Sequence, residues 1–351
     1  MIFPAASWAV VLLLAVSALC WGSWANAQKL SQPWRFELFY YDFALGAAVC
    51  AVIAAFTLGS LNTQDLTFQD NFLLTGYRKM AWAAGAGIVF NLGNMLLAGA
   101  VSAVGMTAAL PIGLGLALAG GVFLNYAVNG EGGNIVFLIA GAILVLLAIV
   151  VTAFACIARQ DSQRSAAAPT PSGARAPKSR KASAGAGITL AILSGILMAA
   201  LLPMTELARL GDTGVAPYGL ALLFAVGVLG STILYAPFFM NFPVHGAPIE
   251  LKHYFKGTKK KHLLGLLAGI VWMAGTAASL VATEASGSFH PGPTVVYTVE
   301  QAGALVSVLW GLLVWREFKD SNERVRVLMS IVVVLLAAGM GAIAAAPYYM
   351  K

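Results

Sequence analysis

One acid, Glu300, interrupts the largely apolar stretch Pro293-Thr-Val-Val-Tyr-Thr-Val-Glu-Gln-Ala-Gly-Ala-Leu-Val-Ser307. The stretch belongs to an apolar run over 293–315, and about 20 mostly apolar residues suffice for a helix to cross a bilayer. A carboxylate at bilayer depth is costly, and it is usually retained where it faces a cavity or a partner. The stretch therefore predicts a membrane-spanning helix with a functional acid near its middle.

Nine further stretches of the 351-residue chain are long and apolar enough to span a bilayer. The chain is 60% hydrophobic and 10% charged, with a mean hydropathy of +0.83, whereas soluble domains are about 25% charged. The sequence predicts an all-α integral membrane protein with ten transmembrane helices. The predicted spans are 6–27, 37–58, 80–101, 104–127, 134–157, 187–208, 217–240, 263–284, 293–315 and 325–346.

The basic residues indicate how the chain crosses the membrane. Most of the 21 Lys and Arg follow the first, fifth, seventh and ninth predicted spans. Positively charged loops stay on the cytoplasmic side, so we expect both termini outside a multi-pass protein of the cell's inner (plasma) membrane. The net charge of +7 then reflects topology and some contact of Lys259–Lys261 with anionic lipid, not a nucleic-acid partner.

A segment rich in Pro, Ser, Ala and basic residues, 159–186, divides the chain. Its composition predicts a disordered cytoplasmic linker between a first five-helix repeat, 1–158, and a second, 187–351. An odd number of spans per repeat inverts the second repeat relative to the first, which predicts a 5+5 inverted repeat. The third spans of the two repeats contain similar stretches, Ala86-Gly-Ile-Val-Phe-Asn-Leu-Gly-Asn94 and Ala268-Gly-Ile-Val-Trp-Met-Ala-Gly-Thr276.

Four stretches carry a family resemblance: Cys20-Trp-Gly-Ser-Trp24, Leu92-Gly-Asn94, Leu124-Asn-Tyr126, and Gln301–Gly311 running on to Trp315-Arg-Glu-Phe318. The chain resembles the drug/metabolite transporter superfamily, in particular its ureide permease and glucose/rhamnose porter branches. The resemblance implies a central cavity lined by the first four helices of each repeat, with the fifth helices packed outside. It also implies proton-driven uptake by alternating access, of ureides in one branch and neutral monosaccharides in the other.

Glu300 is the predicted proton-coupling residue, because it lies about 12 Å along its span and so near mid-bilayer. The alternative is a protonated acid held by a neighbouring backbone group or hydroxyl. Gln301 follows it, and Tyr297 lies on nearly the same helix face, where it could orient the carboxyl group or simply pack.

Other polar and aromatic residues are candidates for substrate binding. Asn91 and Asn94 lie one turn apart, and each amide can donate to and accept from a ureide or a sugar hydroxyl. Hydrogen bonds between helices would explain them equally well. Thr276 is the counterpart of Asn94 in the second repeat. Trp21 could stack on a flat or sugar ring, whereas Trp24 is typical of an interfacial aromatic belt.

Three charged residues are candidate gating residues. Asp42 could close a cytoplasmic gate, or its charge could stabilise the helix N-terminus, which is the simpler interpretation. Glu206 and Arg209 are three residues apart and predict an ion pair at the outer end of their span.

The motifs exclude some classes of function. No Gly-rich phosphate-binding loop or metal-ligand spacing is present, so we expect neither a nucleotide, a metal nor another cofactor, and no enzyme activity. The small residues over 339–345 could serve a homodimer contact or internal packing.

The sequence predicts a secondary active transporter that imports a small neutral polar solute together with protons. The solute is a ureide or nucleobase-like heterocycle or a monosaccharide. A drug or metabolite exporter of the same superfamily is the alternative, although Asn91, Asn94 and Gln301 are more polar than an exporter's cavity requires.

Overall fold

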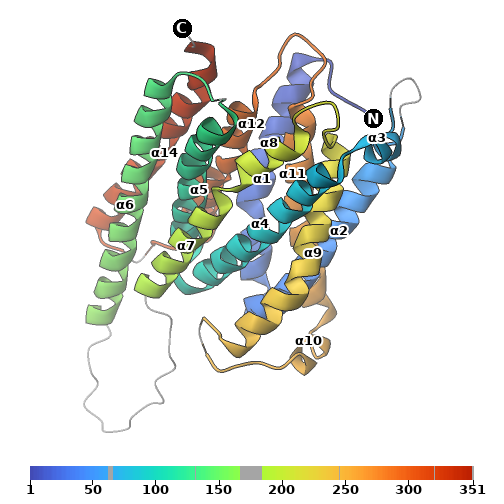
Figure 1. Ribbon diagram of the computed structural model, residues 1–351. Helices are drawn as coiled ribbons and strands as arrows, with labels where there is room; N and C mark the ends of the chain where they lie inside the picture. The colour runs from blue at the N-terminus through green and yellow to red at the C-terminus, as the bar shows by residue number, and fades with distance from the viewer. Residues whose placement is uncertain (62–65, 131, 167–183, 245, 320, 350–351) are drawn as a thin grey trace.

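The computed structural model describes residues 1–61, 66–130, 132–166, 184–244, 246–319 and 321–349, and every regular element in these ranges is a helix (Figure 1). Ten helical segments in them are long and apolar enough to cross a membrane. The predicted all-α fold with ten spans is therefore confirmed. The spans are α1 (Ser7–Leu30), α2 (Phe36–Phe56), α4 (Tyr77–Val104), α5 (Met106–Asn129), α6 (Ile135–Ala166), α7 (Ala184–Met198) with α8 (Leu201–Arg209), α9 (Pro217–Asn241), α11 (Lys259–Ala282), α12 (Pro293–Gln301) with α13 (Gly303–Leu309) and η1 (Trp310–Val314), and α14 (Glu323–Ala345).

Two short helices lie outside the spans, α3 (Phe68–Leu74) and α10 (Lys252–Phe255), and the 3₁₀-helix η2 (Ala346–Tyr349) ends the tenth span after α14. Both chain termini lie at one end of the bundle, and α10 lies at the other (Figure 1). α6 continues through Ala166 and α7 begins at Ala184, so the rest of the predicted linker 159–186 lies outside the described residues.

Two of the spans are broken, which the sequence analysis did not predict. The sixth changes from α7 to α8 at Ala199 and Ala200, just before Pro203. Proline has no N–H to donate, so Pro203 removes the helical bond that the Ala199 carbonyl would otherwise accept. The ninth span changes from α12 to α13 at Ala302, and Gly303 follows directly. A Cβ at Gly303 would lie 2.8 Å from the Gly22 nitrogen, so this glycine lets α13 approach α1.

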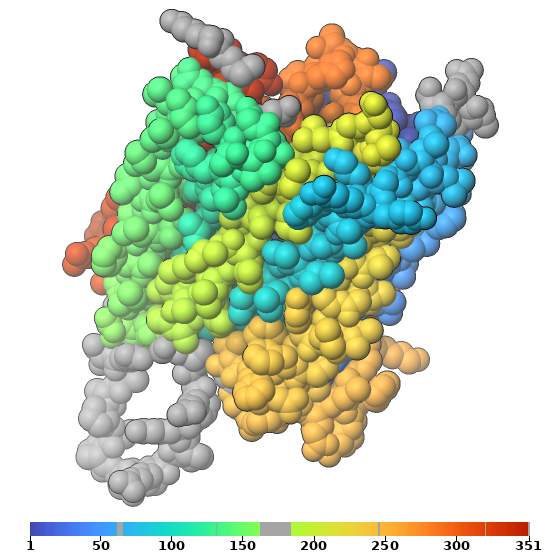
Figure 2. Space-filling view, in the orientation of Figure 1, coloured from blue at the N-terminus to red at the C-terminus, as the bar shows by residue number. Residues whose placement is uncertain are grey.

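α6 and α14 pack against each other at the edge of the bundle and are among its least buried spans (Figure 1). This is the position that the resemblance implies for the fifth helix of each half. The other spans interlock: α11 packs on α1 and α2, while α4 packs on α7, α8 and α9. Figure 2 shows one face of the molecule closed by α6, α7, α4 and α9 lying side by side.

Reciprocal glycines bring two of these helix pairs into backbone contact. Between α2 and α11, a Cβ at Gly46 would collide with the Leu266 carbonyl, and one at Gly269 would collide with the Phe43 carbonyl. Between α4 and α9, a Cβ at Gly87 would collide with the Phe224 carbonyl, and one at Gly227 would collide with the Ala84 carbonyl. Small residues allow such close approach in membranes, where lipid provides little hydrophobic drive for helices to associate.

We expect Gly46→Ala to lower the free energy of unfolding by about 1–3 kcal/mol, because the added methyl group pushes α2 away from α11. Gly230→Ala is the matched control, since a Cβ at that helical position meets no atom within 4 Å. The control should leave stability unchanged or raise it by up to about 1 kcal/mol. Unfolding of the purified protein in detergent measures both, and equal effects would contradict the proposed close contact.

Candidate functional site

A small cavity of about 40 Å³ lies between α8, α9, α11 and α12, toward the end of the bundle that holds the termini. Its wall is apolar on the side of α9, where Leu220 and Phe224 contribute. The other elements contribute polar groups, and these include several predicted site residues. The polar lining residues are Thr205, Glu206, Arg209, Thr276, Ser279, Thr283, Tyr297 and Glu300.

Glu300 lies at the break between α12 and α13, and only 7% of its surface is exposed. The Ser279 hydroxyl of α11 donates a hydrogen bond of 2.5 Å to its Oε2 atom. A carboxyl group in this setting can accept from hydroxyls when ionised and can donate when protonated. Glu300 can therefore bind and release a proton, and it can also form hydrogen bonds with the hydroxyl groups of a solute.

Tyr297 and Thr276 connect the cavity to helices that do not line it. The Tyr297 hydroxyl lies 3.2 Å from the Ala117 carbonyl of α5 and 3.4 Å from the Met198 carbonyl, just before the break in the sixth span. Thr276 accepts a hydrogen bond of 3.1 Å from Trp21 Nε1. The structure therefore brings Glu300, Tyr297, Thr276 and, through Thr276, Trp21 to one place.

An aromatic cluster continues from the cavity into the centre of the bundle. Trp272 stacks on Phe90 with ring centres 4.5 Å apart, and Trp21, Phe43 and Phe224 surround the pair. The Trp272 indole N–H is buried without a hydrogen-bond partner among the described residues. Trp272 and Ser279 were not among the predicted site residues, although Trp272 aligns with Phe90 in the matching stretches of the two halves.

Asn91 and Asn94 do not line this cavity. The Asn91 side-chain amide lies within 3.0 Å of the Val228 carbonyl and of the Ser231 and Thr232 hydroxyls, so it ties α4 to α9. The Asn94 amide donates to the Tyr40 hydroxyl at 2.9 Å. In this conformation both residues hold helices together, which was the alternative interpretation of them.

Gln301 lies beside Glu300 and is 1% exposed, and its Oε1 atom has no hydrogen-bond partner in the described part of the chain. Trp24 is buried against Phe43, with ring centres 5.5 Å apart, and only 2% of it is exposed. Its interpretation as an interfacial belt residue is therefore wrong, because the ring faces the core.

The charged residues predicted as gates lie at opposite ends of the bundle. Arg209 pairs with Glu206 at 2.8 Å and with Glu284 at 2.5 Å, at the end of the Glu300 cavity that lies nearer the termini. The Glu206–Arg209 ion pair is thus present as its spacing predicted. Glu284 is 43% exposed, so the bridge reaches from the cavity wall to the surface.

Asp42 lies toward the other end and joins three elements. It accepts hydrogen bonds from the Tyr254 hydroxyl at 2.6 Å and from His262 Nδ1 at 2.8 Å. Burial, together with the bond to Asp42, raises the pKa of Tyr254 above its usual value, so this phenol remains a donor. This cluster could not be predicted from the sequence, because Tyr254 and His262 are more than 200 positions away from Asp42.

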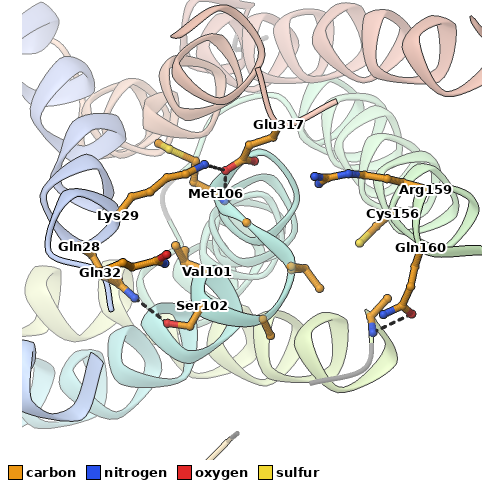
Figure 3. Close-up of a pocket in the computed structure, with 14 residues that line it drawn as sticks. Gln28, Lys29, Gln32, Val101, Ser102, Met106, Cys156, Arg159, Gln160 and Glu317 are labelled. Atoms are coloured by element: carbon orange, nitrogen blue, oxygen red, sulfur yellow. Dashed lines mark hydrogen bonds and ion pairs between the residues drawn. The ribbon is translucent and has the colours of Figure 1, made fainter. Parts of the chain in front are cut away.

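Glu317 has a structural role beyond the closing turn that the resemblance implies. It accepts hydrogen bonds from the backbone N–H groups of Met106 (3.3 Å) and Thr107 (3.0 Å), and from the Thr107 hydroxyl. It also pairs with Lys29 at 2.5 Å (Figure 3). A carboxylate is favoured at a helix N-terminus, so Glu317 caps α5 from the other half of the chain.

If Asn91 ties α4 to α9, its side chain and that of Ser231 should be energetically coupled. We expect a double-mutant cycle of Asn91→Ala and Ser231→Ala to give a coupling of about 0.6–1.7 kcal/mol, the range measured for hydrogen bonds between membrane helices. Unfolding of the purified variants in mixed micelles measures it. A coupling energy of zero would contradict the structural role of Asn91 and favour a role in solute binding.

Comparison with known proteins adds a functional class. A family model described as "Sugar transport protein" matches residues 209–344, and this match supports a transporter of sugar-like solutes. A similar solved structure, described only as a crystal structure of a protein, has 15% identity and a TM-score of 0.51 over 95% of this chain and 96% of its own. This likeness concerns the fold alone. No curated protein matches the chain.

Proposed function

We propose that this protein is a secondary active transporter that imports a monosaccharide or a similar neutral polyol together with a proton. The observation that carries the proposal is the position of Glu300. It is a buried acid at a helix break, bonded to one hydroxyl and bordered by a cavity. Acids inside a membrane bundle are functional by default, and the sugar-transport match supplies the class of solute. A ureide or nucleobase-like heterocycle is the second candidate solute, favoured by the aromatic ring of Phe224 in the cavity wall and by Trp272 behind it.

Proton and solute binding would be coupled at one carboxyl group. When Glu300 is ionised, both oxygens accept, and a sugar hydroxyl can compete with Ser279 for them. When Glu300 is protonated it carries no charge. The free-energy cost of burying the carboxyl group between closed helices is then smaller. Aromatic faces beside the site suit the apolar face of a pyranose ring, and the Trp272 N–H can donate to a hydroxyl.

A cavity of about 40 Å³ holds roughly one water molecule and not a sugar, so transport requires the surrounding helices to separate. The breaks at Ala199–Ala200 and at Ala302 border the cavity and are natural hinges for α8 and α12. The Glu206–Arg209–Glu284 bridge is our candidate for the outer gate, and the Asp42–Tyr254–His262 cluster for the inner gate.

Alternating access is the mechanism expected of two inverted repeats. The helix packing supports such a relation between 1–158 and 187–351. The contact of α2 with α11 has a counterpart in that of α9 with α4, and α6 packs on its own counterpart, α14. The reciprocal glycines repeat this pairing. We place both termini outside the inner (plasma) membrane, since they share one end of the bundle and the basic residues near α10 lie at the other.

The first test is uptake of labelled D-glucose, L-rhamnose and allantoin into proteoliposomes, with and without an inward proton gradient. We expect the gradient to drive accumulation of one of the sugars. Glu300→Gln should abolish gradient-driven accumulation but retain exchange of labelled for unlabelled solute, because the variant carries a permanently neutral site.

The matched control is Glu323→Gln, which changes an exposed acid in the first turn of α14 and should leave uptake at the wild-type level. Accumulation of allantoin alone would replace the sugar with the heterocycle. Gradient-driven accumulation that survives in Glu300→Gln would remove Glu300 from the coupling mechanism, and proton-driven efflux would overturn import.

A further inference from the structure

A second, larger pocket of about 270 Å³ is drawn in Figure 3. The helix ends that form it lie at the opposite end of the bundle from the termini (Figure 1). The end of α1 contributes Lys29 and Gln28, and the end of α6 contributes Cys156 and Arg159. The junction of α4 and α5, together with Glu317, completes the wall. None of the residues assigned above to solute binding or proton coupling lines this pocket.

The pocket has an excess of positive charge. Lys29 and Arg159 face it from opposite sides, and Glu317 is its one acidic lining residue (Figure 3). The Glu317 carboxylate is already neutralised by Lys29 and by the N-terminus of α5. Arg159 lies over the Phe318 ring at 4.7 Å, and no ion pair joins it to a carboxylate of the described residues. Its guanidinium is therefore placed to hold an anion.

A buried acceptor lies beside these cations. Gln28 is 2% exposed, and its amide nitrogen donates to the Ala98 carbonyl and the Ser102 hydroxyl, both at 2.9 Å. These bonds fix the orientation of the amide and leave Oε1 without a partner among the described residues. A buried carbonyl oxygen without a donor is unfavourable, and a ligand hydroxyl could supply one.

We propose that this pocket binds a small phosphate ester that also carries hydroxyl groups. Arg159 would hold the phosphate through its fork of N–H donors, and a hydroxyl would donate to Gln28 Oε1. Either a soluble polyol phosphate or a phosphatidylglycerol headgroup has this chemistry. The proposal concerns binding alone and does not depend on the proposed sugar transport.

The test uses the full-length protein in nanodiscs of phosphatidylcholine, with thermal unfolding as the readout. Glycerol 3-phosphate is the soluble probe, glycerol and inorganic phosphate test each half of the chemistry, and nanodiscs containing phosphatidylglycerol test the lipid source. We expect glycerol 3-phosphate or phosphatidylglycerol to raise the melting temperature more than the partial probes do. Arg159→Gln should weaken the binding by about tenfold or more, because a charged hydrogen-bond donor is lost. The exposed Arg324→Gln, at the same end of the bundle, should not.

A second measurement uses the wild-type chain, so it does not depend on the folding of a variant. Cys156 lines the pocket, whereas Cys50 does not, and neither is in a disulfide. We expect the stabilising probe to slow maleimide labelling of Cys156 and to leave Cys50 unchanged, as followed by mass spectrometry. The proposal is overturned if no probe stabilises the protein, if Arg159→Gln binds as the wild type does, or if Cys156 is not protected.

Discussion

Backbone contact between crossing helices is the constraint on which the rest of this bundle depends. α2 meets α11, and α4 meets α9, at glycines where an added Cβ would collide with a carbonyl group of the partner helix. Such contact brings the aromatic rings of α4 and α11 to stacking distance at the centre. It also positions α11 so that Ser279 reaches Glu300 on α12. The polar site is thus a product of close packing around it.

Several buried polar atoms that lack a hydrogen-bond partner among the described residues lie at or beside the two proposed sites. Trp272 Nε1 and Gln301 Oε1 lie beside the Glu300 site, and Gln28 Oε1 lies in the pocket at the other end. Each unsatisfied group opposes the stability of this closed conformation by an amount on the order of 1–3 kcal/mol. A fold that retains several of them is less stable in this closed form than it would otherwise be. A solute that supplied the missing partners would stabilise the conformation to which it binds.

The spans and the acid at the centre of the ninth span could be predicted, because both depend only on residues that are close together in the sequence. Glu300 could be selected by its depth alone. Contacts between distant segments could not be predicted: the sequence left open whether Asn91 binds a solute or another helix, and the structure shows that it contacts α9, some 140 positions later. Asp42 likewise depends on Tyr254 and His262, whose approach is set by the packing of α2 on α11. The break at Ala302 was missed because Gly303 matters through its contact with α1, whereas Pro203 was a local signal for the other break that the prediction did not use.

The cap on α5 has a consequence for biogenesis. Lys29 and the first N–H groups of α5 depend on a carboxylate that is 288 residues further along the chain than Lys29. During synthesis, nine spans must therefore enter the membrane before these groups acquire their partner. Until then the first N–H groups of α5 lack the carboxylate that caps them in the complete structure. The Lys29 ion pair and the cap of α5 can therefore form only after the ninth span and Glu317 have been synthesised.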